Sequence, residues 1–145
     1  MQWAIESDTF GFRIVLTDQP LTRSGILSTI SSVCDPLGIA APFLLVGKSI
    51  LQDLCGTQLS WDEEIGEKYR VRRENWKSQL PALENFSMER CLKPANFGPV
   101  VSRQLHNFSD ASSAGYGQVT YLRIENEKGH IHCAFLMGKA PVAPV

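Results

Sequence analysis

The sequence lacks a hydrophobic run long enough to cross a membrane, and it lacks the layout of a secretory leader. Its longest apolar stretch covers residues 38–47 and is interrupted by Pro42, whereas a transmembrane helix needs ~18 or more consecutive apolar residues. The first residues do not show a basic segment followed by an apolar one, which is the arrangement of a signal peptide. We therefore expect an intracellular location, cytoplasmic or nuclear, and no membrane partner.

Cysteine is scarce, and neither sign of charge dominates. The 4 cysteines are widely and irregularly spaced, a distribution typical of reduced thiols rather than of a disulfide framework. The 14 basic and 15 acidic residues leave a formal net charge of −1. This balance excludes a strongly basic nucleic-acid-binding tail but permits a local basic face.

The apolar content, by contrast, is sufficient for a folded core. Hydrophobic residues make up 43% of the 145 residues, and a domain of this size buries roughly 70% of the surface that its unfolded chain exposes. Intrinsic disorder is therefore excluded for most of the chain.

Two stretches, one near each end, predict β-structure. Residues 2–6 and 10–15 alternate apolar and polar side chains around a turn-forming segment, which indicates a β-hairpin. Three further strands are expected at Leu105–Asp110, Tyr116–Glu125 and His130–Met137, with turn residues between them. The short connections favour an antiparallel meander.

The middle of the chain predicts three helices. Thr22 is placed to cap the first of them, and Pro42 suits the first turn of the second. Ser60 and Glu63 form a capping-box pattern, which predicts that the third helix opens there and ends before Pro81.

These patterns predict an α+β fold in four parts along the chain. The parts are an N-terminal hairpin at 1–20, a helical region at 21–80, a proline-containing linker at 81–104 and a truncated three-stranded antiparallel sheet at 105–145.

Asp110 is the candidate catalytic residue and the candidate metal ligand. It ends an apolar strand and is followed by small residues and a hairpin, and hard cations such as Mg²⁺ prefer carboxylate oxygens. Two-metal phosphodiester cleavage needs several convergent carboxylates, so Asp110 alone does not suffice. The alternative is an Asx-type turn, in which the carboxylate bonds amide hydrogens of its own loop.

A basic cluster on the expected third helix is the candidate nucleic-acid-binding surface. One interpretation is contact with phosphates, which makes binding salt-dependent. The alternative is a solvated face with Glu64–Lys68 and Arg70–Glu74 pairs. The cluster consists of Lys68, Arg70, Arg72, Arg73 and Lys77.

Several short motifs together give the chain a family resemblance. It resembles the pol polyprotein of Bel/Pao-type LTR retrotransposons, from the end of the reverse transcriptase into the start of RNase H. The matching pieces, in family order, are Trp3-Ala4-Ile5-Glu6-Ser7-Asp8-Thr9-Phe10, Leu21-Thr22-Arg23, Gly25-Ile26-Leu27-Ser28, Asp35-Pro36-Leu37-Gly38, Ala41-Pro42-Phe43, Trp61-Asp62, Leu105-His106-Asn107-Phe108-Ser109-Asp110-Ala111-Ser112, Gly115-Tyr116-Gly117 and His132-Cys133 through Gly138-Lys139-Ala140.

The resemblance implies a role within a larger polyprotein. The hairpin corresponds to the primer grip, the helices to the thumb and connection, and residues 105–137 to the first three RNase H strands. Asp110 then corresponds to the first metal-binding aspartate, with Mg²⁺ or Mn²⁺ as cofactor in the intact parent. The implied activities of the parent are RNA-directed DNA synthesis and RNase H cleavage, and the implied partners are an RNA–DNA hybrid or primer–template and the remainder of pol.

The sequence also departs from the family pattern. No Asp-Asp pair of the reverse-transcriptase motif occurs, and the expected RNase H helix carrying the second carboxylate does not precede Val145. We therefore expect an excerpt or a decayed copy that is non-catalytic alone and binds no metal tightly.

Two other functions remain open. Such regions are also labelled as retropepsin-like aspartic peptidases, which need Asp-Thr/Ser-Gly loops so that two carboxylates share a proton. The nearest match is Asp8-Thr9-Phe10-Gly11, where Phe10 stands in place of the glycine. The remaining alternative is a non-catalytic nucleic-acid-binding or scaffold remnant.

Overall fold

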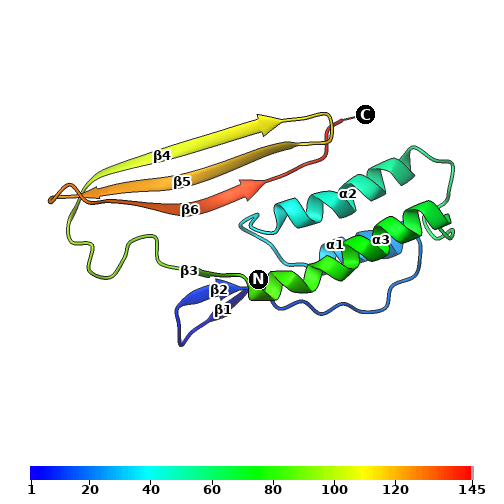
Figure 1. The fold of residues 1–145 in the computed structure, drawn as a ribbon, viewed down its shortest axis with the longest axis horizontal. Coiled ribbons are helices and arrows are strands. Elements are labelled where there is room, and N and C mark those ends of the chain that lie inside the picture. Colours follow the sequence, from blue (N-terminus) through cyan, green and yellow to red (C-terminus); the bar gives the residue numbers. More distant parts are fainter. Residues whose placement is uncertain (145) are drawn as a thin grey trace.

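The chain folds into a helical body and a long antiparallel sheet, with a small sheet beside the helices (Figure 1). The structure is a computed structural model and describes residues 1–144. Helices and antiparallel strands occupy separate stretches of the chain, so the prediction of an α+β fold is confirmed.

The small sheet joins the N-terminus to a segment that follows the helices. Its strands are β1 (Gln2–Ala4), β2 (Thr9–Gly11) and β3 (Ser87–Glu89), hydrogen-bonded in that order. The expected hairpin is present, with Trp3 opposite Phe10. Both of its strands are shorter than the alternating pattern indicates, and β3 lies within the expected linker.

The helical body contains the hydrophobic core. It consists of α1 (Arg23–Ser32), α2 (Ala41–Cys55), α3 (Glu67–Gln79) and a 3₁₀ turn, η1 (Leu80–Asn85). The Thr22 hydroxyl caps α1 by accepting a hydrogen bond from the amide of Gly25 at 3.1 Å, as expected for a threonine at this position. The largest fully buried side chains all lie in these helices or directly after them: Trp76, Ile26, Ile50, Leu54 and Leu80.

The third helix begins later than the Ser60–Glu63 pattern predicts. The Ser60 amide does donate to the Glu63 carboxylate at 3.2 Å, but α3 starts only at Glu67. The intervening backbone pairs with the entry to α1 instead, because the Ile65 amide donates to the carbonyl of Leu21 at 2.8 Å. A tertiary contact therefore overrides a local helix-start pattern.

The long sheet is an antiparallel meander of β4 (Val100–Ala111), β5 (Tyr116–Asn126) and β6 (Ile131–Lys139), in that order. All three expected strands are present, and β4 begins at Val100 rather than at Leu105. A register shift separates Val100 from the rest of β4, and a second one occurs between β5 and β6 at Thr120. From Gln104 to Ala111, every residue of β4 is exposed.

Two glycines join the helical body to the long sheet. The Gly138 amide of β6 donates to the Leu37 carbonyl at 2.7 Å. Gly38 has a φ of +79°, and a Cβ atom placed there would lie 1.8 Å from the Gly138 carbonyl oxygen. Only glycine permits both this backbone conformation and this approach.

Candidate functional site

Asp110 lies near the end of β4, opposite Gly117 of β5. Its side chain is exposed, and one carboxylate oxygen accepts the amide hydrogen of the adjacent Ala111 at 2.9 Å. The turn that follows is held by Ser112 instead. The Ser112 hydroxyl accepts from the amide of Ala114 at 3.2 Å and from that of Gly115 at 3.3 Å.

An apolar groove runs beside Asp110, between the long sheet and the helical body. Its volume is about 580 Å³, and Asp110 and Lys139 are its charged lining residues. An aromatic row forms the sheet side of the groove. The rings of Phe108 and Tyr121 are 6.2 Å apart, and those of Tyr121 and Phe135 are 5.8 Å apart, both in edge-to-face geometry.

The metal ligands that phosphodiester cleavage requires do not converge around Asp110. Residues 1–144 contain no cluster of three or more histidine, cysteine, aspartate or glutamate side chains that could hold a metal ion. A single exposed carboxylate does not form a two-metal site. Around Asp110, the described residues therefore provide at most one ligand of a two-metal centre.

The residues of the predicted basic cluster do not share one surface of α3. Arg73 is only 2% exposed, and its guanidinium donates to the backbone carbonyl of Gln19 at 2.9 Å. Burial thus removes Arg73 from the solvent-facing cluster. Lys68 and Arg70 are exposed, whereas Arg72 and Lys77 are half-buried.

Ion pairs on α3 differ from the two that the sequence spacing suggests. Arg70 pairs with Glu67 at 3.3 Å, and Arg72 pairs with Asp53 of α2 at 2.6 Å. The Lys68 ammonium lies over the ring of Tyr69, 5.6 Å from its centroid. Exposed ion pairs of this kind contribute little to stability. Lys68 and Arg70 are both exposed to solvent.

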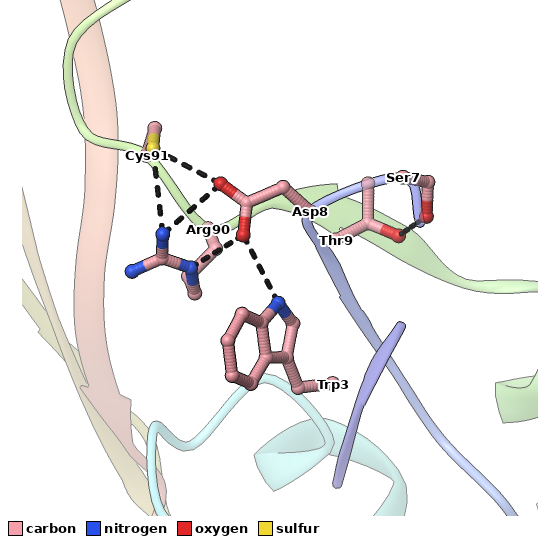
Figure 2. Close-up of polar contacts among 6 residues, drawn as sticks. All are labelled: Trp3, Ser7, Asp8, Thr9, Arg90 and Cys91. Atoms are coloured by element: carbon pink, nitrogen blue, oxygen red, sulfur yellow. Dashed lines mark hydrogen bonds and ion pairs between the residues drawn. The ribbon is translucent and has the colours of Figure 1, made fainter. Parts of the chain in front are cut away.

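A second polar cluster, centred on Asp8, lies where the small sheet ends (Figure 2). Both oxygens of the Asp8 carboxylate accept from Arg90, at 2.6 and 3.1 Å. The Cys91 thiol donates to the same carboxylate at 3.2 Å, and the Trp3 indole nitrogen donates at 3.0 Å. Asp8 itself has a φ of +50°.

These contacts shift two pKa values in opposite directions. The hydrogen bond from Arg90, followed by that from Cys91, lowers the pKa of Asp8 from 3.8 to about 2. The hydrogen bond to Asp8 raises the pKa of the Cys91 thiol. The partners of Asp8 are thus a cation, a thiol and an indole, whereas a peptidase dyad places a second carboxylate beside the first.

Asp8 and Arg90 are far apart in the sequence, so no local pattern identifies this cluster. The one sequence signal is weak: Asp8 stands in a turn, where aspartate tolerates a left-handed backbone. The pairing of β2 with β3 places Thr9 opposite Glu89 and so brings the two segments together.

Among residues 1–144, the cysteines form no disulfide and the helices no membrane span. The 4 cysteines are all exposed and unpaired by disulfides. Within residues 1–144, no helix is both long enough and apolar enough to span a membrane.

An antiparallel three-stranded meander with an aspartate near the end of its first strand is consistent with a fragment of an RNase H-like fold. A family model described as the Pao retrotransposon-like RNaseH-like domain matches residues 22–145. The chain therefore belongs to this family and is a region of a Pao-type retrotransposon pol. The match includes the helical body as well as the long sheet. No curated protein and no solved structure matches the chain.

Proposed function

We propose that this chain is part of the region of its parent pol that binds the RNA–DNA hybrid. In this proposal, Asp110 supplies one carboxylate to a Mg²⁺ or Mn²⁺ site in that region. The position of Asp110 on the first strand of an RNase H-like meander carries this proposal. Its carboxylate is exposed, and the following turn is organised by Ser112. The Asp110 side chain is thus available for a ligand.

The remaining metal ligands come from other parts of the parent in this proposal. Hydrolysis of an RNA–DNA hybrid places charge on both the attacking and the leaving oxygen, and one carboxylate does not hold the two metals that neutralise it. The isolated chain is therefore non-catalytic. RNA-directed DNA synthesis and RNase H cleavage are activities of the whole polyprotein.

Solvent-facing basic residues of α3 contribute contacts to the hybrid backbone. Lys68 and Arg70 provide charge at its surface, and the half-buried Lys77 and Arg72 extend the same helix. Their contribution is electrostatic and independent of sequence. Arg73 has a structural role, since it ties α3 to the segment before α1.

A paramagnetic titration tests the metal assignment in the isolated chain. We expect Mn²⁺ to broaden the amide NMR signals of Ala111 and Gly117, which flank or face Asp110, and we expect Asp110→Asn to abolish this broadening. Asp62→Asn is the control, because Asp62 is an exposed carboxylate in another part of the fold. Unchanged broadening in Asp110→Asn, or its absence in the unmodified chain, contradicts the assignment.

A salt series tests the hybrid-binding surface. Replacing Lys68 and Lys77 with glutamine is expected to reduce the slope of log affinity against log salt concentration for an RNA–DNA hybrid, by about 1 for each phosphate that is no longer neutralised. Lys128→Gln, in the turn after β5, is the matched control. Binding that does not respond to salt contradicts the surface, and Mg²⁺-dependent hybrid cleavage that Asp110→Asn abolishes contradicts the proposed inactivity.

A further inference from the structure

A small pocket lies where the helical body meets the last strand of the long sheet. Its volume is about 280 Å³, and its walls come from the segment before α2, from α2 itself and from the end of β6. The pocket adjoins the Gly38–Gly138 contact, since both glycines line it. Asp110 does not border it, so the pocket is separate from the candidate metal ligand.

Two lysines line this pocket from different parts of the fold. Lys48 belongs to α2, where Ala41, Leu44 and Lys48 share one face at helical spacing. Lys139 is the last residue of β6, and it shares a strand face with Met137. Lys48 is half-buried, and Lys139 is exposed. The docking of β6 on the helical body thus brings two lysines that are far apart in the sequence to one pocket.

The positive charge of these lysines is only partly balanced within the pocket. Among residues 1–144, neither lysine forms an ion pair. Asp35 is the acidic residue that lines the pocket. Its two carboxylate oxygens accept the amide hydrogens of Ile39 and Ala40, each at 2.9 Å. One carboxylate that already binds backbone amides, beside two ammonium groups, leaves the pocket with a net positive charge.

The lysine ammonium groups are the main hydrogen-bond donors that the pocket offers to a ligand. Backbone amides that line it, such as those of Ala41 and Gly138, already donate to other backbone carbonyls. Each ammonium carries three hydrogens to donate and no acceptor. A phosphate group presents several strong acceptor oxygens, so one phosphate can accept from both lysines at once. Lysine binds phosphate in this way as a point charge.

We propose that this pocket binds a phosphate group, held between Lys48 of α2 and Lys139 of β6. The phosphate belongs either to a nucleic-acid backbone or to a free phosphate compound, and the chemistry of recognition is the same for both. The site itself does not depend on the proposed function. Because one lysine comes from the helical body and the other from the long sheet, a bound phosphate also strengthens the attachment between them.

An orthophosphate titration followed by amide NMR tests the site in the isolated chain. We expect orthophosphate, and not chloride at the same ionic strength, to shift the signals of Lys48, Lys139 and their neighbours. Lys48→Gln and Lys139→Gln should each weaken this binding by about tenfold. Lys48→Arg should retain it, because the positive charge remains. Lys128→Gln, in the turn between β5 and β6, is the matched control outside the pocket and should leave the binding unchanged.

Two results of this titration overturn the proposal. One is the absence of these shifts in the unmodified chain. The other is orthophosphate binding that the two glutamine variants leave as strong as before. Because the same spectra report whether each variant is folded, a loss of binding through misfolding is recognised directly.

Binding of an RNA–DNA hybrid distinguishes the two sources of the phosphate. If the phosphate is part of a nucleic-acid backbone, replacing both lysines with glutamine reduces the salt slope of hybrid affinity by about 1, because they neutralise a single phosphate. A reduction of about 2 assigns a separate phosphate to each lysine and overturns the shared site. An unchanged slope together with orthophosphate binding assigns the pocket to a free phosphate compound. A chain that binds orthophosphate here but no hybrid contradicts the proposed function and supports this site.

Discussion

At the scale of single residues, the chain places charged groups according to contacts that are distant in sequence. Asp8 and Arg90 form a bidentate ion pair, and Arg73 is buried against the carbonyl of Gln19. Local sequence gives no reason to separate Arg73 from Arg72, since both stand in one basic run on one helix. Which of them is buried depends on how α3 packs against a segment that precedes α1.

The lowered pKa of Asp8 predicts a distinct acid response. Because its pKa is about 2 in the folded chain and 3.8 ordinarily, Asp8 stabilises the fold above about pH 4, and this contribution is lost as the pH falls towards about 2. We expect the free energy of unfolding of Asp8→Asn to decline less steeply over this range than that of the unmodified chain. Urea unfolding at a series of pH values measures both. Equal slopes contradict the prediction.

The same contact predicts the reactivity of Cys91. Asp8 raises the pKa of the Cys91 thiol, and only the thiolate is the nucleophile. Asp8→Asn should therefore speed alkylation of Cys91 by iodoacetamide at pH 8. Mass spectrometry of the labelled peptides measures the rate, with Cys55 as the internal control because it lies at the end of α2. A rate that stays the same or falls is inconsistent with a hydrogen bond between Cys91 and Asp8.

At the scale of helices and strands, sequence patterns correctly predicted those features that depend on contacts between residues close in the sequence. The Thr22 cap, the proline at the start of α2 and the three strands of the meander are all present. The start of α3 was predicted too early because residues near Ser60 form hydrogen bonds with the start of α1 instead. The Ser24 hydroxyl donates to the Asp62 carboxylate at 2.6 Å, and the Ser24 amide donates to the carbonyl of Trp61 at 3.1 Å.

The packing of α2 on α3 depends on a small residue at their contact. Trp76 is 2% exposed, its indole nitrogen donates to the Phe43 carbonyl at 2.8 Å, and a Cβ atom on Gly47 would lie 2.4 Å from its ring. Gly47→Ala should therefore lower the free energy of unfolding by about 1–3 kcal/mol through overpacking.

Gly56→Ala is the matched control for this prediction. Gly56 ends the same helix at a φ of −75°, and its added Cβ would meet only the carbonyl oxygen of Asp53 at 3.4 Å. We expect its stability to change by less than about 1 kcal/mol. Urea unfolding compares the two variants, and equal losses would contradict the role assigned to Gly47.

At the scale of the whole molecule, the contact between Gly38 and Gly138 fixes the long sheet to the helical body. Gly38→Ala introduces both a left-handed alanine and a clash with the Gly138 carbonyl. Gly129→Ala is a control with a similar φ of +77° and open space around the added Cβ. Gly129→Ala should lower the free energy of unfolding by about 1–2 kcal/mol, and Gly38→Ala should lower it by about 1–3 kcal/mol more. Chemical denaturation of both variants isolates the contribution of the Gly38–Gly138 contact to the free energy of unfolding.

The Gly38–Gly138 contact also bears on the order in which the parts of the chain fold. The helices and the meander are each built from contacts between neighbouring elements, whereas the bond from Gly138 to Leu37 closes a loop of about a hundred residues. The entropy of closing such a loop opposes its early formation, while local contacts form quickly. The Gly38–Gly138 contact is therefore among the last to form, when two pieces that already have their own hydrogen bonds dock against each other.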